Sequence, residues 1–74
     1  DKQYYLDLIT KSIKQHKMLS RKDTDELLWN KLPDWMNDKQ RKNKIGNLLS
    51  ELRINGQIEN IGTPKESKWI LKTN

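Results

Sequence analysis

The side chains best suited to chemistry are concentrated between positions 39 and 50, a stretch without any acidic residue. Its cations and amides are Lys39, Gln40, Arg41, Lys42, Asn43, Lys44 and Asn47. Ammonium and guanidinium groups bind anionic oxygens, and amide side chains donate and accept hydrogen bonds side by side. The stretch therefore predicts non-covalent recognition of an anionic partner that also presents hydrogen-bonding groups.

Catalytic chemistry has few candidates in this sequence. The chain contains no cysteine and one histidine, which excludes a thiolate nucleophile, a cysteine-ligated metal and a His–His metal pair. We expect His16 at the surface, and Asp23, Asp25 and Glu26 are acids suited to the start of a helix. Because no nucleophile set, metal site, phosphate-binding loop or cofactor motif is present, we expect a protein that is not an enzyme.

Length and charge limit the possible classes further. The 74 residues suffice for one small domain, which we expect to span residues 1–74, and the net charge of +5 makes an anionic partner plausible. No apolar run is long enough to cross a membrane. The absence of cysteine is compatible with the cytoplasm, where we expect the protein. The first residue is Asp1 rather than Met, so we expect a piece of a longer protein.

Two helices are predicted before the basic stretch. Apolar side chains recur every three or four positions over residues 2–17 and predict the first helix. Ser20 followed by Asp23 forms a capping box that predicts the start of a second helix at Arg21. That helix should end just before Pro33, because proline disfavours helical geometry in the preceding residue. Between the two helices we expect a short apolar connector.

The basic stretch itself lies on a third predicted helix. Asn37, with Gln40 three positions later, marks its start, and Gly56 is suited to the left-handed position after its end. One stripe of this helix is apolar and must face the core; it contains Ile45, Leu48, Leu49 and Leu52. At 100° per residue, the opposite face carries Lys39, Gln40, Asn43, Gly46, Asn47 and Ser50. Arg41, Lys42 and Lys44 flank its edges.

The remainder of the chain changes to the period of β-strands. Residues 57–61 and 68–72 predict two strands joined by a turn at 62–67. Ile58, Trp69 and Leu71 should share the inward face. We expect the three tryptophans, Trp29, Trp35 and Trp69, in the core; the alternative is that Trp29 or Trp35 is exposed for docking against the rest of a parent protein. The predicted fold class is mainly α with a small β hairpin (α+β): three helices followed by a two-stranded antiparallel unit.

The polar face of the third helix is typical of a helix that enters the major groove of double-stranded DNA. Short amide side chains reach base edges there, asparagine pairs well with adenine, and flanking cations meet phosphates on either wall. Further candidate phosphate contacts are Arg21 and Lys22 at the start of the second helix and Lys65 and Lys68 near the hairpin turn. The alternative is an ordinary solvated face of a lysine- and asparagine-rich chain.

The order of the predicted elements resembles a winged helix-turn-helix domain. Leu48, Leu49, Leu52, Gly56 and Ile58 match a spacing common among winged helices. Over residues 20–72 the chain is similar to the C-terminal winged helix of bacterial RecG-related ATP-dependent DNA helicases, also described as putative transcriptional regulators. In that family the domain follows a Schlafen-type AlbA domain and an ATPase-like region.

This resemblance implies a DNA-binding role, with the third helix as the recognition element and the hairpin as the wing. Lys39, Gln40, Asn43 and Asn47 match the outward recognition positions, while Lys65 and Lys68 fall on the wing. The wing departs from strongly basic examples because it contains Glu66. No helicase motif lies in these residues, so helicase activity is not expected of this module.

A second class of function remains open from the sequence. The same fold could serve as a protein–protein interaction or dimerisation module that contacts other domains of the parent protein, or a second copy, through Trp29, Trp35 and the first helix. An RNA partner is a third possibility.

Overall fold

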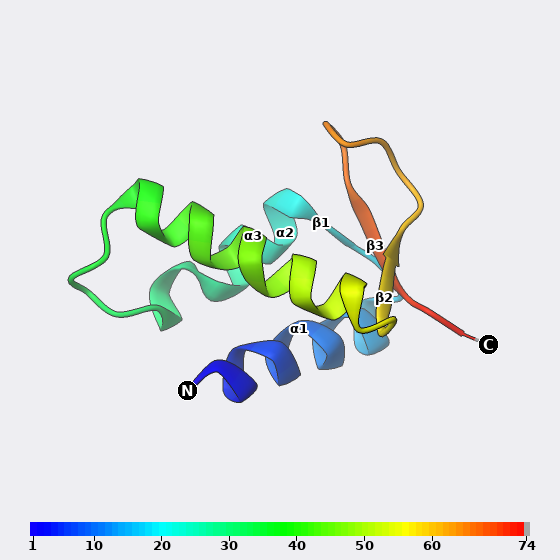
Figure 1. Cartoon of the computed structure of the whole chain (residues 1–74), viewed down its shortest axis with the longest axis horizontal. Coiled ribbons are helices and arrows are strands. Elements are labelled where there is room, and N and C mark those ends of the chain that lie inside the picture. The colour runs from blue at the N-terminus through cyan, green and yellow to red at the C-terminus, as the bar shows by residue number, and fades with distance from the viewer. Residues whose placement is uncertain (74) are drawn as a thin grey trace.

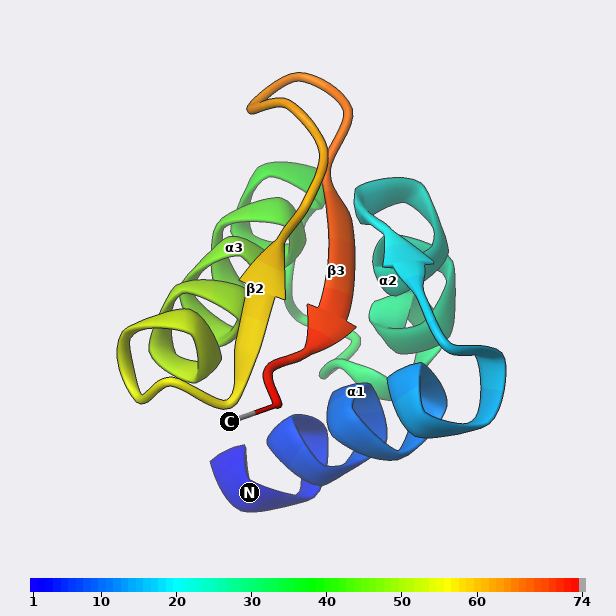
Figure 2. The same cartoon turned by 90° about the vertical axis from the view of Figure 1, so that its right-hand side faces the viewer.

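The computed structural model describes residues 1–73, which form three α-helices, a short 3-10 helix and three short strands (Figure 1). In chain order they are α1 (Lys2–His16), β1 (Leu19–Ser20), α2 (Arg21–Leu28), the 3-10 helix η1 (Trp29–Lys31), α3 (Asp38–Ile54), β2 (Ile58–Asn60) and β3 (Lys68–Leu71). The loop between β2 and β3 projects beyond the helices, whereas α1 lies across the opposite end of the molecule (Figure 2). The three predicted helices are confirmed, although α2 ends earlier than expected because the chain tightens into η1.

Both predicted helix starts are capped as the sequence indicates. At α2, the Ser20 hydroxyl accepts a hydrogen bond from the Asp23 amide at 3.0 Å, and the Asp23 carboxylate accepts one from the Ser20 amide at 3.1 Å. At α3, Asn37 and Gln40 exchange the equivalent pair, each at 2.8 Å. These bonds satisfy amides that a helix start leaves without partners, and so they fix where each helix begins.

The end of α3 also follows the sequence. Gly56 adopts the left-handed conformation, with φ of 76°. Its amide donates to the carbonyl of Arg53 at 3.0 Å, and the Gln57 amide donates to the carbonyl of Leu52 at 2.9 Å. This pair of bonds is the Schellman motif, which turns the chain sharply from α3 into β2.

The sheet differs from the sequence prediction, because the described residues form three strands rather than two. Leu19, expected in a plain connector, and Ser20, expected only to cap the second helix, form β1 and pair antiparallel with β3, opposite Trp69 and Lys68. The strand order is β1-β3-β2, which makes β3 the central strand. A two-residue strand is too short to show an alternating pattern, and its pairing depends on β3, almost fifty residues later.

The core lies between the helices and the inner face of the sheet. It contains Leu6, Ile9, Ile13, Leu19, Leu28, Leu32, Ile45, Leu48, Leu49, Leu52, Ile58 and Trp69. The apolar stripe predicted for α3 is therefore confirmed at all four positions. Trp69 is buried as expected, and Trp29 packs against the core while partly exposed.

The expectation that Trp35 lies in the core is wrong. Its side chain is 72% exposed, on the irregular connection between η1 and α3. No helical or strand periodicity applies in that connection, so an apolar residue type alone did not indicate burial. The result is a large aromatic side chain presented to solvent.

Three helices followed by a hairpin that closes a small antiparallel sheet define the winged helix-turn-helix class. In this arrangement α2 and α3 form the helix-turn-helix, and the β2–β3 loop is the wing. The described part of the chain contains no helix with the length and apolar character needed to cross a bilayer.

Candidate nucleic-acid interface

The outward face of α3 presents amide and ammonium groups to solvent. Its exposed side chains are Lys39, Gln40, Lys42, Asn43, Asn47 and Ser50. The side-chain amides of Asn43 and Asn47 form no hydrogen bond within the part of the chain that is described, although both residues belong to the helical backbone of α3. Both amides therefore retain all their donors and acceptors for a partner. Gln40 differs, because its side-chain oxygen is already used in the cap of α3.

The charge on this face is also uncompensated. Among residues 1–73, the ion pairs join Lys2 to Glu51 at 3.2 Å and Arg21 to Asp25 at 2.9 Å. Neither pair involves Lys39, Lys42 or Lys44, although Lys44 is half-buried where the other two are exposed. The lysines at the start of α3 thus lie beside its amides and form no ion pair among residues 1–73, although Asp38 begins the same helix.

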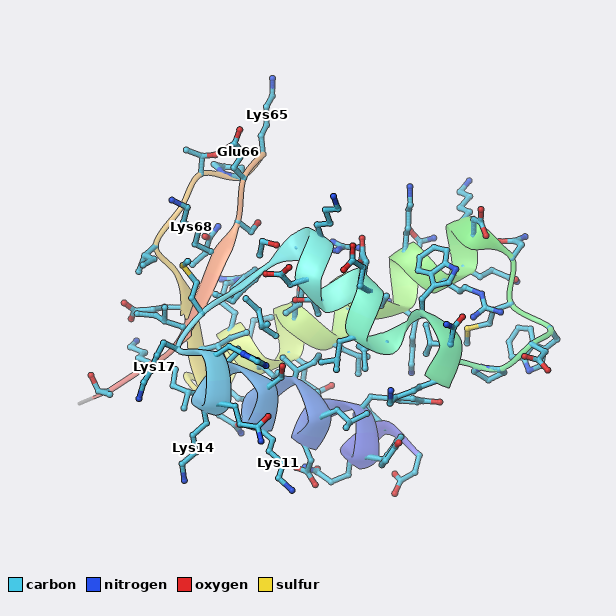
Figure 3. All side chains as sticks on the ribbon, turned by 180° about the vertical axis from the view of Figure 1, so that it is seen from behind. Lys11, Lys14, Lys17, Lys65, Glu66 and Lys68 are labelled. Carbon is cyan, nitrogen blue, oxygen red and sulfur yellow. The ribbon has the colours of Figure 1, made fainter. Side chains whose placement is uncertain are left out.

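The wing carries the next cations. Lys65 and Lys68 project from the β2–β3 loop and the start of β3, with Glu66 between them (Figure 3). Beside them, the start of α2 and the wing enclose a hollow of about 300 Å³ that Lys22 also lines. Four predicted phosphate contacts, Arg21, Lys22, Lys65 and Lys68, therefore line one hollow, together with the acids Asp23 and Glu66.

Hydrogen bonds within the wing hold its shape. The side-chain oxygen of Asn60 accepts from the amides of both Gly62 and Lys68 at 2.8 Å, and the Thr63 hydroxyl accepts from the Glu66 amide at 2.9 Å. A β-carbon on Gly62 would lie 2.2 Å from the carbonyl oxygen of Glu66, so only glycine fits there. The sequence analysis missed Asn60, although an asparagine two residues before a glycine is a known turn signal.

A separate group of lysines lies on α1. Lys11, Lys14 and Lys17 project from the side of α1 that faces away from α3 and the wing (Figure 3). These lysines are not among the DNA-binding residues predicted from the sequence. They carry the same charge as the lysines of α3 but lie on another face of the molecule, so substitutions there serve as a charge-matched control.

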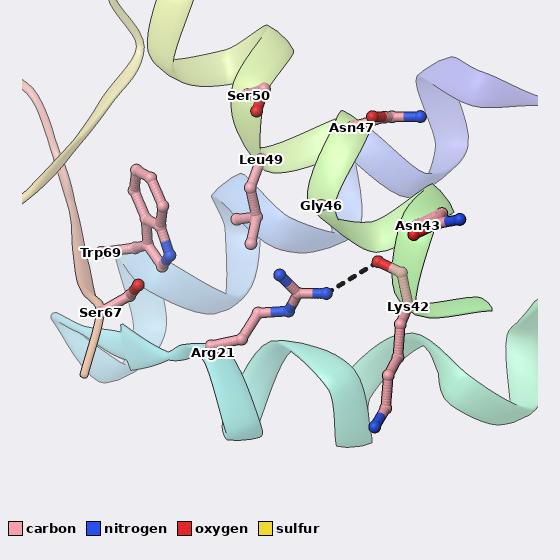
Figure 4. A pocket seen from close by; sticks show the side chains of 9 residues that line it. All are labelled: Arg21, Lys42, Asn43, Gly46, Asn47, Leu49, Ser50, Ser67 and Trp69. Carbon is pink, nitrogen blue, oxygen red and sulfur yellow. Dashed lines mark hydrogen bonds between the residues drawn. The ribbon is translucent and has the colours of Figure 1, made fainter. Parts of the chain in front are cut away.

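A groove connects α3 with the wing strand β3 and the start of α2. It encloses about 400 Å³, and we call it the Trp69 groove (Figure 4). It is lined by Arg21, Lys42, Asn43, Gly46, Asn47, Leu49, Ser50, Ser67 and Trp69. Four of the predicted DNA-binding residues therefore share one surface. Ser50, Ser67 and Trp69 are additional lining residues that the sequence analysis did not include in that set.

Arg21 is fixed at the centre of this groove. Its Nε donates to the Asp25 carboxylate at 2.9 Å, and its Nη2 donates to the Lys42 carbonyl at 2.8 Å, the bond drawn in Figure 4. The arginine thus ties α2 to α3 and passes beside Gly46. A β-carbon on Gly46 would lie 3.5 Å from Nη1, an ordinary contact.

Trp69 leaves a polar atom without a partner at the same place. Its indole Nε1 is buried and has no hydrogen-bond partner among residues 1–73. The side chain as a whole is 8% exposed. A buried donor without an acceptor costs about 1–3 kcal/mol, so such atoms are uncommon in folded proteins.

Arg41, predicted to contact phosphate, has its guanidinium engaged inside the molecule. Nε donates to the carbonyl of Met36 at 3.1 Å, Nη2 to that of Pro33 at 3.3 Å, and Nη1 to that of Trp29. The guanidinium carbon also lies 5.8 Å from the centre of the Trp29 ring. Arg41 therefore holds the connection between α2 and α3, because its five donors match several carbonyls at once.

Other chemistry is not indicated by the geometry. The residues that the structure describes bring together no group of three His, Cys, Asp or Glu side chains that could hold a metal ion. His16 is exposed at the end of α1, as expected. What the arrangement offers is a surface of hydrogen-bond donors, amides and cations around α3.

Comparison with known proteins adds no family to this description. No family model matches the chain, and neither the curated proteins nor the solved structures contain a significant match. The winged helix-turn-helix assignment therefore depends on the observed element order and sheet topology.

Proposed function

We propose that this chain is a DNA-binding winged-helix module, rather than an enzyme, in which α3 is the recognition helix. The observation that carries the proposal is the acid-free outward face of α3, where Asn43 and Asn47 are exposed and unbonded beside exposed lysines. An ordinary solvated helix face has no need to exclude acidic residues. A helix in the major groove lies between phosphates, which repel carboxylates on its outward face.

The dimensions of α3 support this role. An α-helix with its side chains is about 10–12 Å wide, similar to the major groove at about 12 Å. Asn43 and Asn47 are four residues apart, so they lie about 6 Å apart along the helix axis. Two base-pair steps measure about 7 Å. The two amides are therefore spaced to meet base edges about two base-pair steps apart in the duplex.

Phosphate contacts would come from both sides of α3. We assign Lys39, Lys42 and Lys44 to the groove walls, with Lys65 and Lys68 of the wing as additional contacts. With roughly three to five phosphates neutralised, the logarithm of the binding constant falls against the logarithm of salt concentration with a slope of about −3 to −4.5. Non-specific duplex should bind with Kd of about 10⁻⁴ to 10⁻⁶ M at physiological salt.

A fluorescence-anisotropy titration of labelled duplex DNA at several salt concentrations tests the proposal. We expect binding that weakens with salt along the slope given above. Absence of binding even at low salt would rule out the function for this module. An equal preference for duplex RNA would contradict the assignment to DNA.

A charge-matched pair of variants sharpens this test. The double substitution Lys39→Gln with Lys42→Gln should reduce the steepness of the salt dependence by about 1.8, because each phosphate contact contributes about 0.9. The double substitution Lys11→Gln with Lys14→Gln removes the same charge from α1 and should leave the slope unchanged. Equal effects of the two variants would mean that only net charge matters, against a defined interface.

We also propose, from the resemblance in the sequence, that the module belongs to a bacterial RecG-related or transcriptional-regulator protein and acts in the cytoplasm. It would work there together with other domains of the parent protein or with a second copy. An AlbA-like or ATPase-like domain elsewhere in the same polypeptide would support this membership. A secreted or membrane-anchored parent would contradict it.

One observation favours a second candidate function, in which the module docks against protein. Trp35 is 72% exposed, and exposed tryptophans are enriched at protein interfaces. Amide chemical-shift mapping separates the two functions. Shifts confined to residues 39–50 and 62–68 on adding DNA support the first, and concentration-dependent shifts around Trp35, Trp29 or α1 support the second.

A further inference from the structure

We propose that the Trp69 groove binds one phosphate group of the DNA strand, and that the indole Nε1–H of Trp69 donates a hydrogen bond to one of its oxygens. The inference rests on the DNA-binding function proposed above and assigns a particular backbone contact to it. It involves Trp69 and Ser67, two residues outside the recognition helix.

The indole N–H of Trp69 is a donor without a partner among the described residues. Nε1 is buried and turns into the groove toward Arg21 and Ser67 (Figure 4). Indole nitrogen is a donor only, so the missing partner must be an acceptor atom. A phosphodiester oxygen is such an acceptor. It carries no proton, so it does not act as a second donor in the groove.

The side chains around the Trp69 groove supply further hydrogen-bond donors. Arg21 uses Nε and Nη2 in hydrogen bonds, while Nη1 has no partner within residues 1–73 and lies in the groove beside Gly46. The hydroxyls of Ser50 and Ser67 also line the groove and can donate. Donors from three elements therefore converge on one small space.

The side chains that line the Trp69 groove carry positive charge. None of the described residues that line the Trp69 groove carries a carboxylate, whereas two of them, Arg21 and Lys42, are cations. Asp25 neutralises part of the Arg21 charge from outside the groove and also orients the guanidinium. Lys42 has no ion-pair partner in residues 1–73. A singly charged phosphodiester group suits this balance.

The position of the groove indicates that the phosphate belongs to a DNA strand bound along α3. Asn43 and Asn47, the proposed base-reading amides, form part of its wall, and Ser67 connects it to the wing. A DNA strand that leaves the edge of α3 toward the wing must cross this space. A small movement of the Ser67 side chain, which also lines the groove, would give an oxygen access to the covered Nε1.

The test uses Trp69→Phe, which keeps an aromatic ring in the core and removes the N–H group. We expect Kd for duplex DNA to rise about tenfold, the effect of one hydrogen bond to a charged acceptor. Trp35→Phe is the matched control, because it makes the same change at an exposed position, and its Kd should stay within about twofold. Equal Kd values for the two variants would overturn the inference while leaving DNA binding itself intact.

A measurement on the unmodified protein covers the case in which Trp69→Phe does not fold. In ¹H–¹⁵N spectra, duplex DNA should move the indole signal of Trp69 strongly downfield, and those of Trp29 and Trp35 much less. An unmoved Trp69 signal in a DNA-bound sample overturns the inference. Absence of DNA binding by the unmodified protein overturns the proposed function instead.

A third measurement replaces the duplex by inorganic phosphate, with chloride at equal ionic strength as the control. A smaller shift of the same Trp69 signal with phosphate, together with the shift with DNA, supports a site for phosphate oxygens. A response to inorganic phosphate without a response to duplex would assign the groove to a free phosphate and contradict the DNA contact.

Discussion

Replacing Arg41 by lysine should destabilise the fold, although the charge of the side chain is unchanged. Arg41 donates three hydrogen bonds to the carbonyls of Trp29, Pro33 and Met36 and lies over the Trp29 ring. A lysine ammonium is a single point that cannot reach three carbonyls in a plane. At a net value of about 1 kcal/mol for each of two lost bonds, we expect a loss of about 2 kcal/mol.

The loss is measurable by urea and thermal unfolding followed by circular dichroism. For a domain of this size, about 2 kcal/mol corresponds to a fall in Tm of about 8–16 °C. Arg53→Lys is the control, because Arg53 is exposed at the other end of α3, and its effect should stay within about 0.5 kcal/mol.

Equal stabilities of the two lysine variants would refute the reasoning. In that case Arg41 would not hold the α2–α3 connection in solution, and its guanidinium would be available for phosphate as the sequence first suggested. The experiment therefore decides between the structural contacts of Arg41 and a role in DNA binding.

Further predictions concern base reading, the wing and the start of α2. Asn47→Ala should weaken binding to a preferred duplex sequence by about 1–3 kcal/mol while leaving non-specific binding unchanged, and competition titrations against random duplex would reveal the difference; a uniform loss on all sequences would contradict base reading. Asn60→Ala should remove the acceptor of two wing amides, so hydrogen exchange at Gly62 and Lys68 should become faster than in the unmodified chain; unchanged protection would show that Asn60 does not hold the wing. Ser20→Ala should cost about 1 kcal/mol in urea unfolding through loss of the α2 cap, and a change below about 0.3 kcal/mol would contradict that role.

Local signals in the sequence predicted most of the helical framework. The capping pairs Ser20–Asp23 and Asn37–Gln40 each join residues three positions apart. Each pair determines a helix start through contacts between its own two residues. The apolar stripe of α3 is equally local, so its inward and outward faces followed from helical geometry alone. Asn43 and Asn47 are exposed for the same reason.

Features that depend on distant pairing were not predictable in this way. β1 exists only because β3 lies beside it, and the contacts of Arg41 depend on how the connection after η1 folds back over the start of α3. Trp35 was assigned to the core by residue type, but a connection that turns at the surface leaves it exposed. The convergence of Arg21 and Trp69 likewise requires the three-dimensional arrangement of α2, α3 and β3.

Ser20 has a further consequence, because it belongs to two elements at once. It pairs with Lys68 as the last residue of β1 and caps α2 through its hydroxyl. β1, which pairs with the wing strand β3, thus runs directly into α2, without a linker in which the angle between them could vary. Under the proposed function, a DNA double helix would meet a preset shape here. The entropic penalty of ordering the loop is incurred during folding, so association keeps more of its favourable free energy.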